Sequence, residues 1–195
     1  MGRMICFMGK SSAGKDTVFK RLLEDGEPGF QVLVPYTTRP IREGEQDGRE
    51  YFFTDEDNYK RLAQAGRIIE ERSYHTCHGI WRYFTVDDGS IDLEKKSYGI
   101  IGTLEAYTRM CNFWGKDRVI PVLIEVDDGE RLQRALDRER RQPVPKYEEM
   151  CRRFLADEQD FARDKIVAAG IQRRFENDNL ERCLKEIKAY LTELI

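Results

Sequence analysis

Residues 9–17 read Gly-Lys-Ser-Ser-Ala-Gly-Lys-Asp-Thr and directly follow the apolar run 4–8. Two glycines and a lysine at this spacing, between a predicted strand and a predicted amphipathic helix, are typical of a phosphate-binding loop. In such a loop the backbone N–H groups point at phosphate oxygens, and the N-terminus of the helix adds partial positive charge. The loop therefore predicts a strand–loop–helix unit that binds a nucleoside triphosphate or a similar ligand.

We expect Lys15 to reach the β- and γ-phosphates of ATP. Asp16 stands where Ser or Thr normally offers a hydroxyl to Mg²⁺, so we expect Asp16 and Thr17 to hold the metal through oxygen atoms. The alternative is that Asp16 only caps the helix, where its charge is stabilised by the macrodipole. The residues expected to bind ATP in this loop are Gly9, Ser11, Ser12, Ala13, Gly14, Lys15, Asp16 and Thr17.

Apolar runs alternate with helical stretches along the 195 residues, which predicts an α/β fold with a parallel sheet flanked by helices. The polar stretch between the second and third core strands reads as a small inserted lobe. A charged helix is expected over residues 130–141, with only Leu132 and Leu136 able to face a core. The last helix is expected to be capped by Asn177 or Asp178.

The chain has 33 basic and 36 acidic residues, a balance that favours neither a nucleic acid polymer nor a membrane surface as partner. It has no apolar run long enough to span a bilayer and no signal peptide, so we expect a cytoplasmic protein. Five scattered cysteines indicate free thiols. The run His75-Thr76-Cys77-His78 reads as a polar turn, since no second ligand pair at zinc spacing accompanies it.

A second motif narrows the ligand. Residues 37–53 contain Thr-Thr-Arg-Pro, Gly-Glu-x-x-Gly and Tyr-Phe-Phe. Arg39 and Arg42 are three residues apart and joined through a stiff proline, so they can hold one dianionic phosphate from two sides. The hydroxyl of Tyr51 can complete that site.

With these motifs, and with Phe-Glu-Asn-Asp-Asn-Leu-Glu at residues 175–181, the chain resembles the guanylate kinase family. The resemblance implies transfer of a phosphoryl group from ATP to GMP or dGMP, with Mg²⁺ as cofactor. It also implies one domain with three parts, which are a core (about 1–34, 91–126 and 160–195), a monophosphate-binding lobe (about 35–90) and a lid (about 127–159).

The resemblance assigns roles to individual residues. Glu70 matches the acid that reads guanine, and a carboxylate can accept hydrogen bonds from both N1–H and the exocyclic amine of that base. Asn177 matches a residue near the adenine of ATP. In the lid, Arg153 matches one arginine of the family, and Arg138 or Arg140 can fill the place of the other. The remaining assignments to the GMP site are Arg39, Arg42, Tyr51, Tyr83 and Thr85, and those to catalysis are Lys15, Arg42, Arg138 and Arg153.

Three departures from the family pattern keep other functions open. Pro35 replaces a serine, Phe84 replaces a glycine, and residues 100–105 lack the Asp-x-Asp that usually ends a core strand. A kinase acting on another nucleotide or a phosphosugar is the first alternative. A catalytically silent binding module is the second, and the retained glycines and lysine of the phosphate loop count against it.

Overall fold

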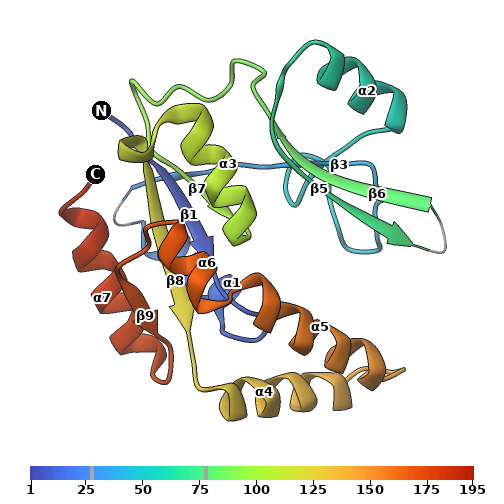
Figure 1. The fold of residues 1–195 in the computed structure, drawn as a ribbon, viewed down its shortest axis with the longest axis vertical. Coiled ribbons are helices and arrows are strands. Elements are labelled where there is room, and N and C mark those ends of the chain that lie inside the picture. Colours follow the sequence, from blue (N-terminus) through green and yellow to red (C-terminus); the bar gives the residue numbers. More distant parts are fainter. Residues whose placement is uncertain (27–28, 77–78) are drawn as a thin grey trace.

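The computed structural model describes residues 1–26, 29–76 and 79–195 of the chain. Its central sheet has five parallel strands (Figure 1). In spatial order these strands are β2 (Gln31–Val32), β7 (Tyr98–Ile101), β1 (Met4–Met8), β8 (Val119–Glu125) and β9 (Arg174–Glu176). The predicted α/β fold is therefore confirmed.

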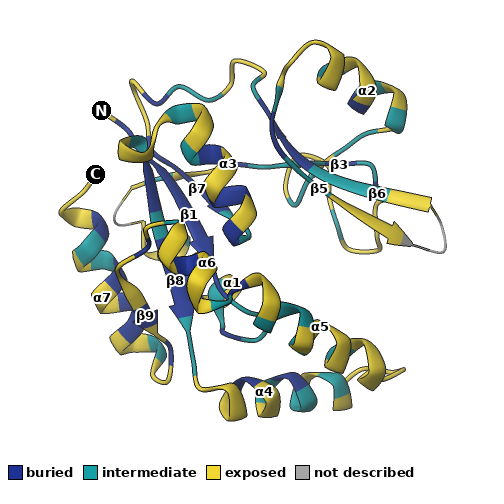
Figure 2. Cartoon of the chain, viewed as in Figure 1, coloured by how far each residue is buried: buried dark blue, intermediate teal, exposed yellow. Residues whose placement is uncertain are grey.

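Helices cover both faces of this sheet. Strand β1 is buried on both sides (Figure 2), and its side chains alternate between two apolar clusters, as the two-residue period of a strand requires. Ile5 and Phe7 pack with α1 (Lys15–Asp25) and α7 (Leu180–Thr192). Met4, Cys6 and Met8 pack with the elements of the opposite face, which are α3 (Leu104–Trp114) and α6 (Arg163–Ala168). A short 3₁₀ helix, η1 (Lys116–Arg118), leads into β8.

A second sheet with its own small core forms the lobe. Its strands, in spatial order, are β4 (Phe52–Phe53), β3 (Tyr36–Thr37), β6 (Gly79–Val86) and β5 (Ile68–Thr76), and helix α2 (Glu56–Gln64) packs against them. Phe84 is fully buried in this core, stacked on Tyr36 at a ring-centroid distance of 5.6 Å and edge-on to Tyr59 at 5.2 Å. Phe84 thus fills the interior of the lobe.

The lobe contacts the core at a β-bulge in β5. The register of β5 against β6 shifts between Ile68 and Glu70, so Ile69 is the extra residue. Ile69 is buried in the apolar cluster that contains Cys6 and Leu104, and it therefore anchors β5 to the central sheet and α3. Glu70, the next residue, pairs with Thr85 inside the lobe.

The helix pair α4 (Asp128–Arg140) and α5 (Tyr147–Asp160) buries different residues from those expected. The expectation that Leu132 faces a core is wrong, because 40% of its surface is exposed, whereas Arg131 is only 1% exposed. Arg131 forms ion pairs with Asp128, Asp157 and Glu158, and its guanidinium lies 3.9 Å from the centroid of the Phe154 ring. Charge pairing and a cation–π contact thus outweigh hydrophobicity on this helix. Leu136 is only partly buried.

The cap of α7 also differs from the expectation. Asn179 is the N-cap, since its side chain accepts a hydrogen bond from the backbone N–H of Arg182 at 3.0 Å. Asn177 is instead buried, and its amide nitrogen donates to the carbonyl of Ala13 at 2.8 Å. The residue that was expected to cap a helix or to lie near adenine thus supports the phosphate loop.

The described cysteines, Cys6, Cys111, Cys151 and Cys183, carry free thiols. Cys77 and His78 belong to the run that the sequence predicts to be a polar turn, and they lie outside the described residues. No helix in the described part of the chain combines the length and the apolar character needed to cross a bilayer.

Replacing Phe175 with alanine should lower the free energy of unfolding by about 3–5 kcal/mol, because the side chain is fully buried in β9 and packs on Tyr190 at 5.4 Å. Urea unfolding followed by circular dichroism measures this change. The control is Val167→Ala, whose side chain is 64% exposed and should change stability by less than about 0.5 kcal/mol. Similar losses in both variants would contradict the packing described for β9.

Candidate functional site

Backbone crowding explains the two glycines of the phosphate loop. A Cβ at Gly9 would lie 2.4 Å from the carbonyl oxygen of Ile124, and one at Gly14 would lie 2.2 Å from Asn177 Nδ2. Between them, Ser12 is the one described residue other than glycine with a positive φ, 66°. Its hydroxyl oxygen is buried and has no hydrogen-bond partner among the described residues. A strained backbone and an unpartnered hydroxyl in a loop of this kind point to a ligand site.

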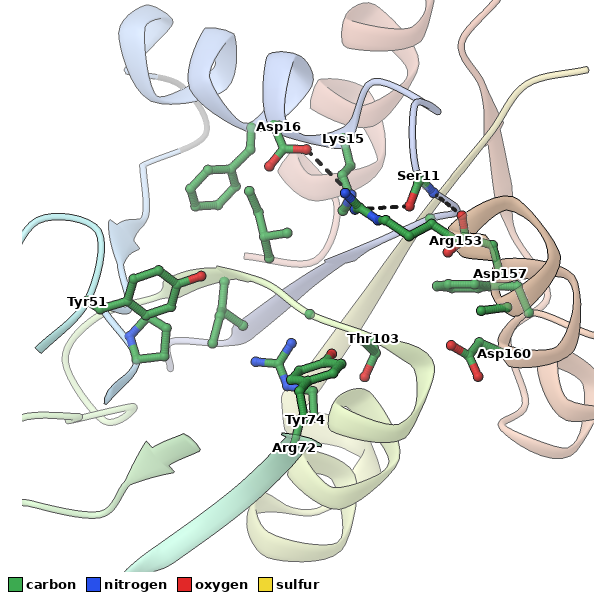
Figure 3. Close-up of a pocket in the computed structure, with 18 of the residues that line it drawn as sticks. Ser11, Lys15, Asp16, Tyr51, Arg72, Tyr74, Thr103, Arg153, Asp157 and Asp160 are labelled. Atoms are coloured by element: carbon green, nitrogen blue, oxygen red, sulfur yellow. Dashed lines mark hydrogen bonds and ion pairs between the residues drawn. The ribbon is translucent and has the colours of Figure 1, made fainter. Parts of the chain in front are cut away.

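The loop opens onto a cavity of about 470 Å³ (Figure 3). Four parts of the fold line it, namely the phosphate loop with the start of α1, the ends of β2 and β7 in the central sheet, the lobe, and α5. Lys15 Nζ lies at the loop end of this cavity, 3.4 Å from an Asp16 carboxylate oxygen. Asp16 lines the cavity with an exposed side chain, whereas Thr17 is exposed but does not line it. Of the two expected metal ligands, the structure brings only Asp16 to the cavity.

Helix α5 contacts the loop directly. Arg153 Nη2 lies 3.2 Å from Ser11 Oγ, so this predicted lid arginine reaches the phosphate loop. The backbone N–H of Ser11 donates to an Asp157 carboxylate oxygen at 2.8 Å, and Arg131 pairs with the same oxygen at 3.3 Å. Lys10 Nζ contacts both carboxylate oxygens of Glu158 at 2.6 and 2.7 Å. Two carboxylates of α5 thus bind groups of the phosphate loop, namely the Lys10 ammonium and the Ser11 N–H.

Arg138, the other predicted lid arginine, has an exposed side chain on α4 and lines a small hollow together with Arg153 and Ser11. The sequence analysis did not identify Arg131 or Asp157. Neither belongs to a recognisable motif, because each acquires its partner only when α4 and α5 pack against each other and against the loop.

In the lobe, Arg39 is held inside a polar and aromatic cage. Its guanidinium donates to both carboxylate oxygens of Glu45 at 2.8 and 2.9 Å and to the Tyr83 hydroxyl at 3.2 Å. The rings of Tyr51 and Phe53 each lie 5.5 Å from its central carbon. The hydrogen bonds from Arg39 lower the pKa of the Glu45 carboxyl. Arg39 is therefore brought together with Tyr51, as the motif predicts, and with Tyr83, which the resemblance assigns to the same site.

Arg42 lies outside this cage. Its side chain is exposed, and its backbone N–H donates to Glu45 at 2.8 Å. Glu45 therefore organises the loop from both sides by binding the guanidinium of Arg39 and the backbone of Arg42.

Glu70 is completely buried and does not line the cavity. One carboxylate oxygen accepts a hydrogen bond from Thr85 Oγ1 at 2.9 Å, and the other lies 3.4 Å from Arg72 Nε. Burial raises the pKa of the nearby Cys6 thiol, and the Glu70 carboxylate adds to that shift. Arg72, which the sequence analysis missed, lines the cavity in place of Glu70. The two-residue period of a strand, counted from Glu70, is the signal that could have identified it.

The end of β7, where the family pattern has Asp-x-Asp, contributes Gly102 and Thr103 to the cavity wall. Thr103 caps α3 by accepting a hydrogen bond from the backbone N–H of Ala106 at 3.2 Å. The carboxylates that line the cavity are those of Asp16, Asp157 and Asp160, from α1 and α5. No three of the described His, Cys, Asp or Glu side chains are grouped closely enough to hold a metal ion by themselves, so the fit to Mg²⁺, which prefers hard oxygen ligands, rests on Asp16 together with phosphate oxygens.

The N-terminal part of the chain is similar in sequence to known guanylate kinases. Residues 1–79 match the family described as guanylate kinase. The guanylate kinase of Rhodopseudomonas palustris (strain HaA2) is 39% identical over 79 residues, which cover 40% of this chain and 36% of that protein. The guanylate kinase of Streptococcus pneumoniae (strain ATCC BAA-255 / R6) is 40% identical over 73 residues, covering 37% of this chain and 35% of that protein. The aligned segment thus spans about a third of each relative.

The likeness of the fold extends further than the likeness of the sequence. The crystal structure of guanylate kinase from Anaplasma phagocytophilum aligns with all of this chain and with 87% of its own length, at a TM-score of 0.64 and 21% sequence identity. This similarity supports the fold alone. The sequence match ends within the β5–β6 hairpin, whereas the structural match continues to the C-terminus.

Replacing Asp157 with asparagine should tighten ATP binding several-fold, because the carboxylate next to the Ser11 N–H repels the phosphates that the loop attracts. Isothermal titration calorimetry with Mg–ATP measures this change. Asp160→Asn is the matched control, since Asp160 lines the same cavity but has no hydrogen bond to the loop among the described residues. Equal tightening in both variants would indicate only the general electrostatic effect of removing a negative charge near the cavity. Weaker binding in Asp157→Asn would indicate that this carboxylate is a ligand of the metal.

Proposed function

We propose that this chain, whose residues 1–79 match the family described as guanylate kinase, transfers the γ-phosphoryl group of ATP to GMP or dGMP. One observation carries the proposal. The phosphate loop, the lid helix α5 and the lobe open on a single cavity, so a phosphoryl donor and an acceptor can meet there (Figure 3).

The donor is assigned to the loop side. Lys15 and the loop N–H groups would hold the β- and γ-phosphates, and Arg153 reaches the same loop from the lid. Phosphoryl transfer requires the protein mainly to align two phosphates and to neutralise charge on the migrating group. Arg42 and Arg138 have exposed side chains that do not line this cavity in the structure, and we assign them to that neutralisation when the substrates are bound.

Mg²⁺ is the cofactor that such a reaction implies. Asp16 would hold it, directly or through water, and Thr17 would contribute only if its side chain turned toward the cavity. When bound, the ion neutralises charge on the ATP phosphates. Asp16 lies in the first turn of α1, and that helix begins after Gly14 without a side-chain cap.

The acceptor is assigned to the lobe side. Tyr51 lines the cavity, and the caged Arg39 and the hydroxyl of Tyr83 lie directly behind it. These groups would hold the acceptor phosphate together with Arg42. Glu70 and Thr85 would define the base site, with Arg72 between them and the cavity.

A different acceptor is the second candidate. It is favoured by Pro35, which lines the cavity where the family pattern has a hydroxyl, and by the absence of a carboxylate at the end of β7. Phe84, which replaces a glycine of the family pattern, does not support this alternative. Its ring is buried in the lobe and does not line the cavity.

An acceptor screen tests the proposal. ADP release in a coupled assay should be fast with GMP and dGMP and at least about a hundredfold slower with AMP, CMP and UMP, because the base site is matched to one pattern of donors and acceptors. Lys15→Met should abolish activity while leaving the melting temperature unchanged. A preferred acceptor other than a guanine nucleotide, with Lys15 still required, would establish the second candidate instead.

The two lobe arginines should behave differently when each is changed to alanine. Arg42→Ala should raise the KM for GMP by about ten- to a hundredfold without lowering stability, because the side chain is exposed. Arg39→Ala should also destabilise the fold, by about 3–5 kcal/mol, because it leaves the carboxylate of Glu45 without its bidentate partner. Steady-state kinetics and urea unfolding measure the two effects, and equal stability losses would contradict this division.

A further inference from the structure

We propose that Arg72 is the side chain that contacts the acceptor base, and that Glu70 acts behind it as a positioning residue. The consequence is a substrate class wider than guanine nucleotides, namely the 6-oxopurine nucleoside monophosphates, with or without an amino group at position 2. This inference rests on the proposed function and specifies the base site of that function.

The position of Arg72 follows from the strand. Glu70 and Arg72 are two residues apart on β5, beyond the bulge, and therefore project from the same face. The side chain of Glu70 has no exposed surface, whereas that of Arg72 is 17% exposed and lines the cavity. Figure 3 shows Arg72 beside Tyr74 in the cavity, with Tyr51 across from them and Thr103 close by. A base entering the cavity therefore meets Arg72 before Glu70.

Charge keeps Arg72 in place. Thr85 donates to one oxygen of Glu70, and Arg72 lies 3.4 Å from the other, which has no hydrogen-bond partner in the described part of the chain. If a neutral base displaced Arg72 to reach this oxygen, a fully buried carboxylate would lose its positive partner, which is strongly unfavourable. Contact with Arg72 itself leaves the ion pair intact. The pair thus favours a base that binds to the guanidinium.

The guanidinium selects one edge of a purine. Its forked N–H donors match two adjacent acceptors, and the O6 and N7 atoms of guanine form such a pair. Adenine presents N7 next to an amino group, which is a donor and therefore opposes Arg72. Hypoxanthine carries the same O6 and N7 as guanine. The 2-amino group lies on the opposite edge of the base, so an enzyme that reads through Arg72 does not depend on it.

Substrate analogues distinguish a base contact made by Arg72 from one made by Glu70. This experiment needs only the wild-type enzyme. We expect kcat/KM for 7-deaza-dGMP, which lacks N7, to be at least tenfold below that for dGMP. We expect kcat/KM for IMP, which lacks the 2-amino group, to lie within about threefold of that for GMP. The reverse pattern, with IMP at least tenfold weaker than GMP and 7-deaza-dGMP equal to dGMP, would overturn the proposal. Wild-type enzyme that uses neither GMP nor dGMP would instead refute the proposed function.

Variants then test whether Arg72 causes the preference for substrates that carry N7. Arg72→Lys keeps the charge but loses the fork, so it should lower kcat/KM for dGMP at least tenfold and make 7-deaza-dGMP as good a substrate as dGMP. Glu70→Gln should reduce the same preference, since it removes the charge that positions Arg72. Arg109→Lys is the matched control, because Arg109 is exposed on α3 and pairs with Glu105 outside this cavity. A retained preference for N7 in Arg72→Lys would exclude Arg72 as the base contact.

Discussion

The backbone N–H groups of the phosphate loop require anionic partners, and much of the structure is arranged around this requirement. A loop of this kind exposes several donors toward one point, so it is stable only when acceptors surround it. Here the carboxylate of Asp157 accepts from the Ser11 N–H, and the amide of Asn177 supports the loop from behind at Ala13. Arg131 neutralises Asp157 and is itself almost fully buried. Helices α4 and α5, far from the loop in sequence, are thus held against it by charge.

In the lobe, the charged groups that need partners are arginine side chains. Two of its arginines are already paired with carboxylates within the protein, Arg39 with Glu45 and Arg72 with Glu70. The bidentate hydrogen bonds to Glu45 fix the orientation of the Arg39 guanidinium before a ligand arrives, and the charge of Glu70 holds Arg72 beside the cavity. The cost of burying these charges is offset by the attraction between the partners, by the hydrogen bond that Arg39 donates to Tyr83 and by the hydrogen bond that Thr85 donates to Glu70.

Features that depend on neighbours in the sequence could be predicted, and features that depend on packing between elements could not. The phosphate loop, the succession of core strands along the chain and the grouping of Arg39 with Tyr51 follow from local spacing and periodicity. Hydrophobicity alone favoured Leu132 over Arg131 on α4, and the partners that bury Arg131 lie on a helix whose position the sequence does not specify. The strand period places Arg72 on the same face as Glu70, but only the burial of Glu70, which depends on packing, makes Arg72 the exposed member of the pair.

The bulge in β5 also ties one wall of the cavity to the core. Ile69 packs in the apolar cluster of the core, whereas Ile68 and the residues from Glu70 onward pair with β6 in the lobe sheet. Arg72 follows on the same strand and lines the cavity. The strand that carries Arg72 is thus anchored in the core as well as in the lobe.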